Sequence, residues 1–123
     1  VGRDVIAISV WIEKTVSQRL PDVNAADLAE AWRSLLHRAR LSKHHRVSRE
    51  ELSVRAHMSS ILRALKERRV VEFAELFEPR RGVGVLVVTF LALLELAREL
   101  LIEITQSAGF GPIYVKLAHA QSA

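Results

Sequence analysis

The residues of this chain that could carry chemistry are histidines and serines, and their spacing does not assemble a reactive site. His44 and His45 are adjacent, so on a helix their side chains point apart, and no cysteine or nearby carboxylate completes a metal site with them and His37. His57 lies just before the Ser59–Ser60 pair, at a spacing that does not readily form a nucleophile–base pair, and no orienting acid is evident. The sequence therefore predicts neither a metal site nor an activated nucleophile.

The glycines and the missing cysteines exclude two further kinds of site. Gly82, Gly84, Gly109 and Gly111 are not followed by Gly-Lys-Ser/Thr, so they do not form a phosphate-binding loop. The absence of cysteine excludes disulfides and thiolate metal sites, and it is compatible with a reducing compartment. We therefore expect a protein that is not an enzyme and that binds no cofactor.

Composition narrows the class of protein further. With 123 residues, the chain can form one compact domain or a small domain with a helical extension. Its net charge of +4 is too small to indicate nucleic-acid binding by itself. The most apolar stretch, residues 83–94, is shorter than the roughly twenty residues of a membrane span, so we expect a soluble protein with no membrane partner. The chain starts at Val1 rather than at a methionine, which is compatible with a fragment of a longer protein and leaves open whether the sequence is whole.

The secondary-structure elements that must position any site are predicted more clearly in some parts of the chain than in others. Residues 4–19 hold apolar side chains at near-helical spacing around Trp11 and predict either a helix or a loosely extended arm. Residues 25–40 show one apolar stripe and a capping residue, Asn24, which together predict a helix. Residues 41–52 are polar and aperiodic, which is typical of a linker.

The second half of the chain predicts a regular order of elements. Ser53 is a candidate N-cap for the first helix, and a capping box of Ser48 and Glu51 competes with it. The predicted elements are a helix ending near Arg69, a strand over 70–72, a short helix over 74–77 stopped by Pro79, a turn over 80–84, a helix over 85–98, and strands over 101–106 and 113–117 joined by a Gly/Pro turn.

This order is that of a winged helix, in which the second and third helices form a helix-turn-helix and the hairpin is the wing. We therefore predict a mostly α fold with a small β-hairpin. It comprises a helical middle region and linker over residues 1–47, followed by a winged-helix domain over residues 48–123.

The helix predicted over residues 85–98 occupies the position that reads DNA in other winged helices. Such a helix needs polar side chains that reach bases and cations that contact phosphates. Here its first turn is aliphatic, and Arg98, at the far end, is the one side chain suited to a base. The predicted wing tip, residues 108–111, carries no cation. The pattern favours a protein partner over a DNA duplex.

The same helix is apolar on nearly all sides. One stripe can face the core of the domain: Leu86, Phe90, Leu93, Leu94 and Ala97. A second stripe is then left over for another partner: Val85, Val88, Thr89, Ala92 and Leu96. Each such side chain gains roughly 1.5–3 kcal/mol on burial, so the second stripe predicts a protein-binding surface. The alternative is that the N-terminal region of the same chain covers it.

Several segments of the chain resemble the C-terminal half of the bacterial kleisins, the segregation and condensation protein A (ScpA) family. The segments that carry the resemblance are 86–96 (LVVTFLALLEL), 71–77 (VEFAELF), 110–115 (FGPIYV), 47–55 (VSREELSVR), and the stretch from Leu20 to Val23 with Asp27, Leu28, Ala31 and Trp32. The N-terminal helical domain of the family, with its Phe-Glu-Gly-Pro-Leu-Asp-Leu-Leu start, is missing from this sequence.

The resemblance implies a subunit of the SMC–ScpA–ScpB complex, which condenses and segregates chromosomes in the cytoplasm at the nucleoid. In that family the C-terminal winged helix binds an SMC ATPase head, any ATP hydrolysis belongs to the partner, and DNA is met only through the complex. The middle region associates with a ScpB dimer, which makes Trp11, Leu28 and Trp32 candidate anchors. Trp32 has an alternative place in the core of its own helix.

Two other functions stay open on the sequence alone. A winged-helix DNA-binding regulator would use Arg80, Arg81 and the basic residues between Arg38 and Arg49, and would show a steep salt dependence. An oligomerisation module would pair the aliphatic helix with its own copy.

Overall fold

The computed structural model describes residues 22–41 and 48–118. Within these ranges lie three α-helices, α2 (Ala25–Leu41), α3 (Val54–Arg68) and α4 (Val83–Arg98), and three strands, β1 (Val70–Glu72), β2 (Ile102–Gln106) and β3 (Ile113–Leu117). Three short 3-10 helices complete the list: η1 (Glu50–Leu52), η2 (Phe73–Leu76) and η3 (Pro79–Arg81). The element predicted over residues 4–19 lies outside the described residues, as do His44 and His45.

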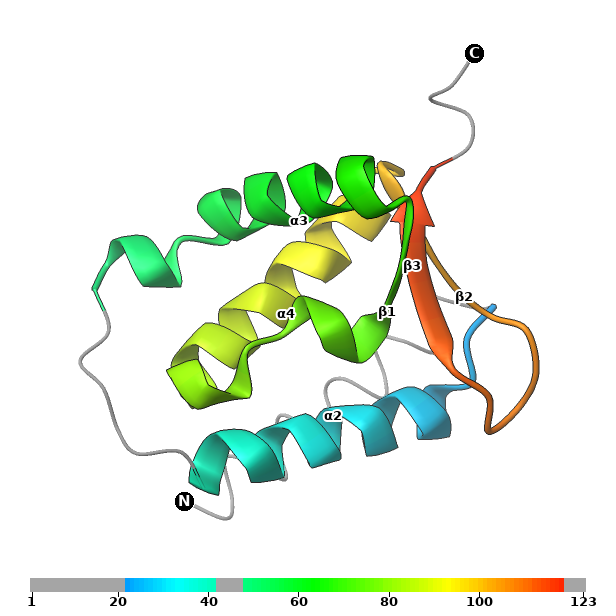
Figure 1. Cartoon of the computed structure of the whole chain (residues 1–123), viewed down its shortest axis with the longest axis horizontal. Helices are drawn as coiled ribbons and strands as arrows, with labels where there is room; N and C mark the ends of the chain where they lie inside the picture. Colours follow the sequence, from blue (N-terminus) through cyan, green and yellow to red (C-terminus); the bar gives the residue numbers. More distant parts are fainter. Residues whose placement is uncertain (1–21, 42–47, 119–123) are drawn as a thin grey trace.

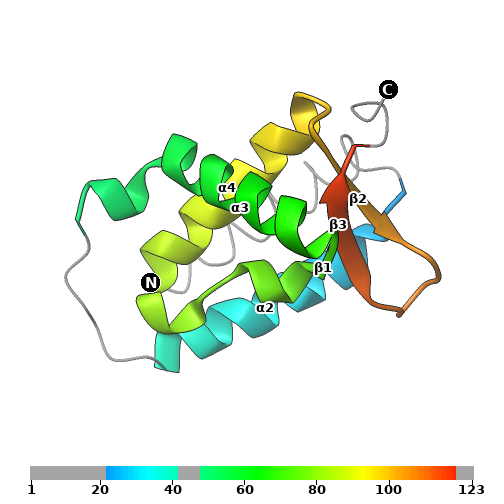
Figure 2. The ribbon, with the colours of Figure 1, turned by 45° about the horizontal axis from the view of Figure 1, so that its top comes forward.

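The helices are arranged around α4. Figures 1 and 2 show α4 between α3 and α2, with the small sheet closing one end of the three helices. The sheet is antiparallel with the order β1-β3-β2, so the strand before the helix-turn-helix pairs with the last strand of the hairpin. This topology confirms the predicted mostly α fold with a hairpin and is compatible with a winged helix.

Local sequence explains where the helices begin. Asn24 caps α2 by accepting a hydrogen bond from Asp27 N at 3.0 Å, as predicted. Ser48 and Glu51 form a reciprocal capping box, at 3.0 and 3.2 Å, and Ser53 caps α3 at 3.1 Å. Both candidates are therefore used: the Ser48–Glu51 bonds enclose the turn that leads into η1, and Ser53 caps α3.

The segment before α4 differs from the predicted turn over residues 80–84. Pro79 opens η3, and Gly82 then takes a φ of 98°, a conformation that residues with a side chain rarely adopt. This sharp change of direction lets α4 begin at Val83, two residues before the predicted start at Val85.

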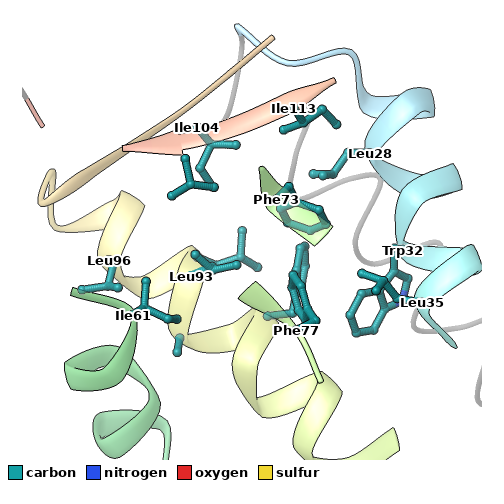
Figure 3. Close-up of a cluster of buried hydrophobic side chains, with 14 of the residues drawn as sticks. Leu28, Trp32, Leu35, Ile61, Phe73, Phe77, Leu93, Leu96, Ile104 and Ile113 are labelled. Carbon is teal, nitrogen blue, oxygen red and sulfur yellow. The ribbon is translucent and has the colours of Figure 1, made fainter. Parts of the chain in front are cut away.

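One hydrophobic core joins α2 to the winged helix. Trp32 of α2 is fully buried, with its ring centroid 5.0 Å from that of Phe90 and 6.0 Å from that of Phe77. Figure 3 shows side chains from α2, α3, α4 and the sheet meeting in this cluster. The core therefore extends across the domain boundary predicted near residue 48, and α2 packs as part of the same body as the predicted winged helix.

Candidate protein-docking surface on the central helix

The second apolar stripe predicted on α4 faces α3. Val85, Thr89, Ala92 and Leu96 are buried, with exposed fractions of 1%, 4%, 0% and 0%. The Thr89 hydroxyl donates to the Val85 carbonyl oxygen at 2.8 Å and lies 3.4 Å from Nδ1 of His57 on α3. The prediction that these four side chains point outward is therefore wrong, because α3 packs along this side of α4.

The face of α4 that is left between α2 and α3 carries different residues. We define the outer face of α4 as six residues at helical spacing, all half-buried or exposed: Gly84, Val87, Val88, Leu91, Glu95 and Arg98. Val88 is the one member of the predicted stripe that belongs to it. Its aliphatic centre, Val88 and Leu91, has no group that could read a base edge.

A charged group closes the C-terminal end of the outer face. Arg98 donates to both carboxylate oxygens of Glu95, and this hydrogen bonding raises the pKa of the guanidinium. A hydrogen bond with Glu95 raises the pKa of the neighbouring Glu99 carboxyl. The outer face thus presents an apolar centre with a paired charge at its edge, which is the usual composition of a protein-docking surface.

The α3-facing side of α4 borders, through Val85 and Thr89, a groove of about 490 Å³ that is also lined by α3, η1, η2 and η3. Glu51 binds Arg81 at 3.1 Å across this groove, and its main-chain carbonyl accepts from Nε2 of His57 at 2.7 Å. Hydrogen bonds from Ser48 and Arg81 lower the pKa of the Glu51 carboxyl. These contacts fasten η1 to the helices, so His57 serves as a structural residue rather than as the base for Ser59–Ser60.

The described residues show no grouping of metal ligands. No group of three or more histidine, aspartate or glutamate side chains in residues 22–41 and 48–118 is placed to hold a metal ion. Arg81, one of the cations that a DNA-binding regulator would use, is engaged by Glu51 and by Glu78, whose carboxylate lies 3.7 Å away.

Three residues were predicted to anchor a contact with ScpB, and two of them lie in the hydrophobic core. Leu28 and Trp32 are fully buried against α4 and the aromatic cluster, so the prediction that they present a surface is wrong for this conformation. Trp32 Nε1 is buried without a hydrogen-bond partner among the described residues, which is consistent with a purely apolar role. Trp11 lies outside the described residues and stays a prediction.

The wing is fastened to the start of α2, a contact that the sequence did not reveal. Asp27 Oδ2 accepts from Phe110 N at 2.7 Å and from Gln106 Nε2 at 2.9 Å, and Gln106 Oε1 accepts from Asn24 N at 2.9 Å. In the sequence Asp27 reads as a residue that favours the helix dipole. The partners lie about eighty positions apart in the chain, so local spacing carries no signal for them.

Topology and surface together are compatible with a winged-helix-like arrangement in which α4, the third helix, has an outer face with an aliphatic centre. Residues 3–118 match the family described as Segregation and condensation protein ScpA. The chain belongs to this family.

Curated relatives agree with that assignment. The chain is 41% identical to Segregation and condensation protein A of Xylella fastidiosa strain 9a5c over 115 residues, which cover 93% of this chain and 38% of the relative. For the proteins of the same name from Listeria innocua and Coxiella burnetii the identities are 40% and 32%, with 77% and 94% of this chain and 39% and 44% of the relatives covered. The chain therefore spans about two fifths of the length of these relatives. Across the described ranges, none of the helices has the length and apolar character that crossing a bilayer requires.

Proposed function

We propose that the chain is the C-terminal part of a non-enzymatic kleisin subunit of an SMC–ScpA–ScpB complex, and that its winged helix docks on an SMC ATPase head. In this role it contributes to chromosome condensation and segregation in the cytoplasm, at the nucleoid, and meets DNA only through the complex. Family membership supports the role in segregation and condensation, and the composition of α4 supports a protein partner.

The observation that carries the docking proposal is the outer face of α4. Val88 and Leu91 lie at its centre, half-buried, on the helix that in DNA-reading winged helices enters the major groove. Completing the burial of each such side chain contributes up to roughly 1.5–3 kcal/mol. Docking on a protein through this face therefore needs no charge–charge contacts of the kind that a duplex offers. The same location thus serves protein docking in place of base recognition.

The predicted contact with a ScpB dimer rests on different residues. Using Leu28 or Trp32 as anchors would require α2 to leave the core, at a cost of several kcal/mol for the tryptophan alone. We therefore place that contact in the middle region before α2, with Trp11 as the predicted anchor.

The docking proposal is tested with Val88→Glu and Leu91→Glu in the full chain, titrated with the purified SMC head from the same organism. Each change places a charge at the centre of the interface, and we expect affinity to fall by about a hundredfold or more with unchanged circular dichroism. Leu41→Glu is the matched control, since Leu41 is 73% exposed at the end of α2 and lies off the outer face. Normal binding by both face variants would contradict the docking surface. Binding of a DNA duplex with a steep salt dependence would favour the regulator instead.

A further inference from the structure

The tip of the wing presents one large apolar side chain to solvent. Phe110 is 96% exposed, the largest exposed fraction among the exposed apolar side chains of the described residues. Its backbone has a φ of 62°, in the left-handed region that favours glycine, so the position accommodates a phenylalanine only against a local preference. Neither burial nor backbone preference within the chain explains a phenyl ring here.

The backbone of Phe110 is nevertheless held in a defined place. Asp27 accepts the Phe110 N–H at 2.7 Å, while the Gln106 side chain joins Asp27 to the carbonyl oxygen of Gly111 at 3.0 Å. The amide of Gln106 also accepts from Asn24 N, so both of its ends are bonded. Because the backbone of Phe110 is already fixed, only the rotamer freedom of its side chain is lost when a partner covers the ring.

A shallow groove of about 390 Å³ lies beside the tip of the wing. Ala31, Phe73, Ala74 and Ile113 contribute apolar atoms to it, and Phe110 itself forms part of its lining. Pro112 extends the apolar surface on the exposed side. Phe110 and the groove that it lines together form a largely apolar surface, which we call the wing patch.

The surroundings of the wing patch are acidic. Asp27 contacts it directly, Glu72 lines the groove, and Glu30 is exposed one turn after Asp27, next to Ala31. Residues 104–113 contain no cation, and in α2 none precedes Arg33. This charge opposes a duplex, which attracts cations, and it complements a protein surface bordered by lysine or arginine side chains.

We propose that the wing patch is a second docking site, which inserts Phe110 into an apolar cavity bordered by lysine or arginine side chains on the SMC head. This inference rests on the proposed function and adds a contact to it, because the outer face of α4 contains no wing residue. Aromatic anchors in preformed pockets dominate many interfaces, and Phe110 has the exposure and fixed backbone that this role requires.

Phe110→Gly in the full chain tests the inference by calorimetric titration with the purified head. Glycine suits the φ of 62° and the ring has little contact to lose, so the thermal midpoint is expected to stay within a few degrees of wild type. Affinity for the head is expected to fall by about tenfold or more. Leu100→Gly is the matched control, because Leu100 also has a φ of 62°, is 73% exposed, and lies beyond the other end of β2.

A charge variant checks the second half of the proposal. Glu30→Lys places a cation beside the wing patch, and we expect a several-fold weaker affinity that depends less steeply on salt than that of wild type. An unchanged or stronger affinity would overturn the proposed border of lysine and arginine.

The outcomes separate the two proposals. If wild type binds the head and Phe110→Gly loses no more affinity than Leu100→Gly, the wing inference is overturned while docking through α4 stands. If Phe110→Gly weakens binding of the ScpB dimer and leaves head binding intact, the assigned partner is wrong. If wild type does not bind the head, the proposed function fails and the wing inference fails with it.

Discussion

The α3-facing side of α4 and the centre of its outer face are both largely aliphatic, but their environments differ. On the side that faces α3, Leu96 is fully buried, whereas on the outer face Val88 and Leu91, also aliphatic, are only half-buried. The difference comes from the neighbours of α4, since α3 and α2 lie on two sides of the helix (Figures 1 and 2), whereas Val88 and Leu91 stay half-buried. An aliphatic side chain on such a helix therefore becomes interface or core according to which neighbour packs beside it.

The largest effect on the free energy of unfolding is expected when a charge is introduced on each side of α4 in two separate variants. Leu96→Glu buries a carboxylate without a partner and is expected to cost at least about 4 kcal/mol, enough to unfold a marginally stable domain. Leu91→Glu can direct its carboxylate to solvent and is expected to cost roughly 1 kcal/mol or less. Urea unfolding followed by circular dichroism measures both. Similar costs for the two variants would erase the distinction between the sides.

How much of this arrangement the sequence can predict depends on the range of the interactions. The bounds of α2 and β3 and the positions of the capping residues follow from the local sequence pattern. These predictions agree with the structure within about one residue. Periodicity also shows that α4 has more apolar surface than one core contact needs. It does not say which stripe stays open, because the position of α3 around α4 is set by tertiary packing.

The same limit explains the two sites that sequence reasoning misplaced or missed. Trp32 looked like a surface anchor because tryptophan is frequent at interfaces, but the aromatic residues that enclose it, Phe77 and Phe90, lie far along the chain. The exposure of Phe110 depends on the fold of the wing and on Asp27, again a distant contact. The signal available in the sequence was an apolar residue, Phe110, in a Gly/Pro turn. The sequence alone predicts no role for that residue.

A second pair of variants tests the side of α4 that faces α2. Trp32→Ala removes the largest side chain of the shared core and is expected to cost about 3–5 kcal/mol in the free energy of unfolding. Trp32→Phe also creates a cavity, but it removes the buried N–H that has no partner among the described residues, so we expect a smaller net cost of about 1–2 kcal/mol.

Urea unfolding at several temperatures measures both tryptophan variants. A Trp32→Ala protein as stable as wild type would show that α2 is not an essential part of the core. In that case the domain boundary predicted near residue 48 would describe the stability of the chain better than the shared cluster does.

The smallest expected effect concerns η1, which the Glu51 contacts hold beside the α3-facing side of α4. Hydrogen bonds from Ser48 and Arg81 keep the pKa of Glu51 below its ordinary value in the folded chain. A depressed folded-state pKa means that this stabilisation is fully present above the ordinary value of 4.5 and is lost as the pH falls through the lower, folded-state value. Glu51→Gln should therefore flatten the acid limb of a thermal-stability profile and lower the midpoint slightly at neutral pH. Glu50→Gln is the matched control, because Glu50 is the adjacent glutamate and its side chain is exposed. An equal flattening in both variants would mean that the acid response comes from overall charge, and that η1 is not fastened to the helices through Glu51.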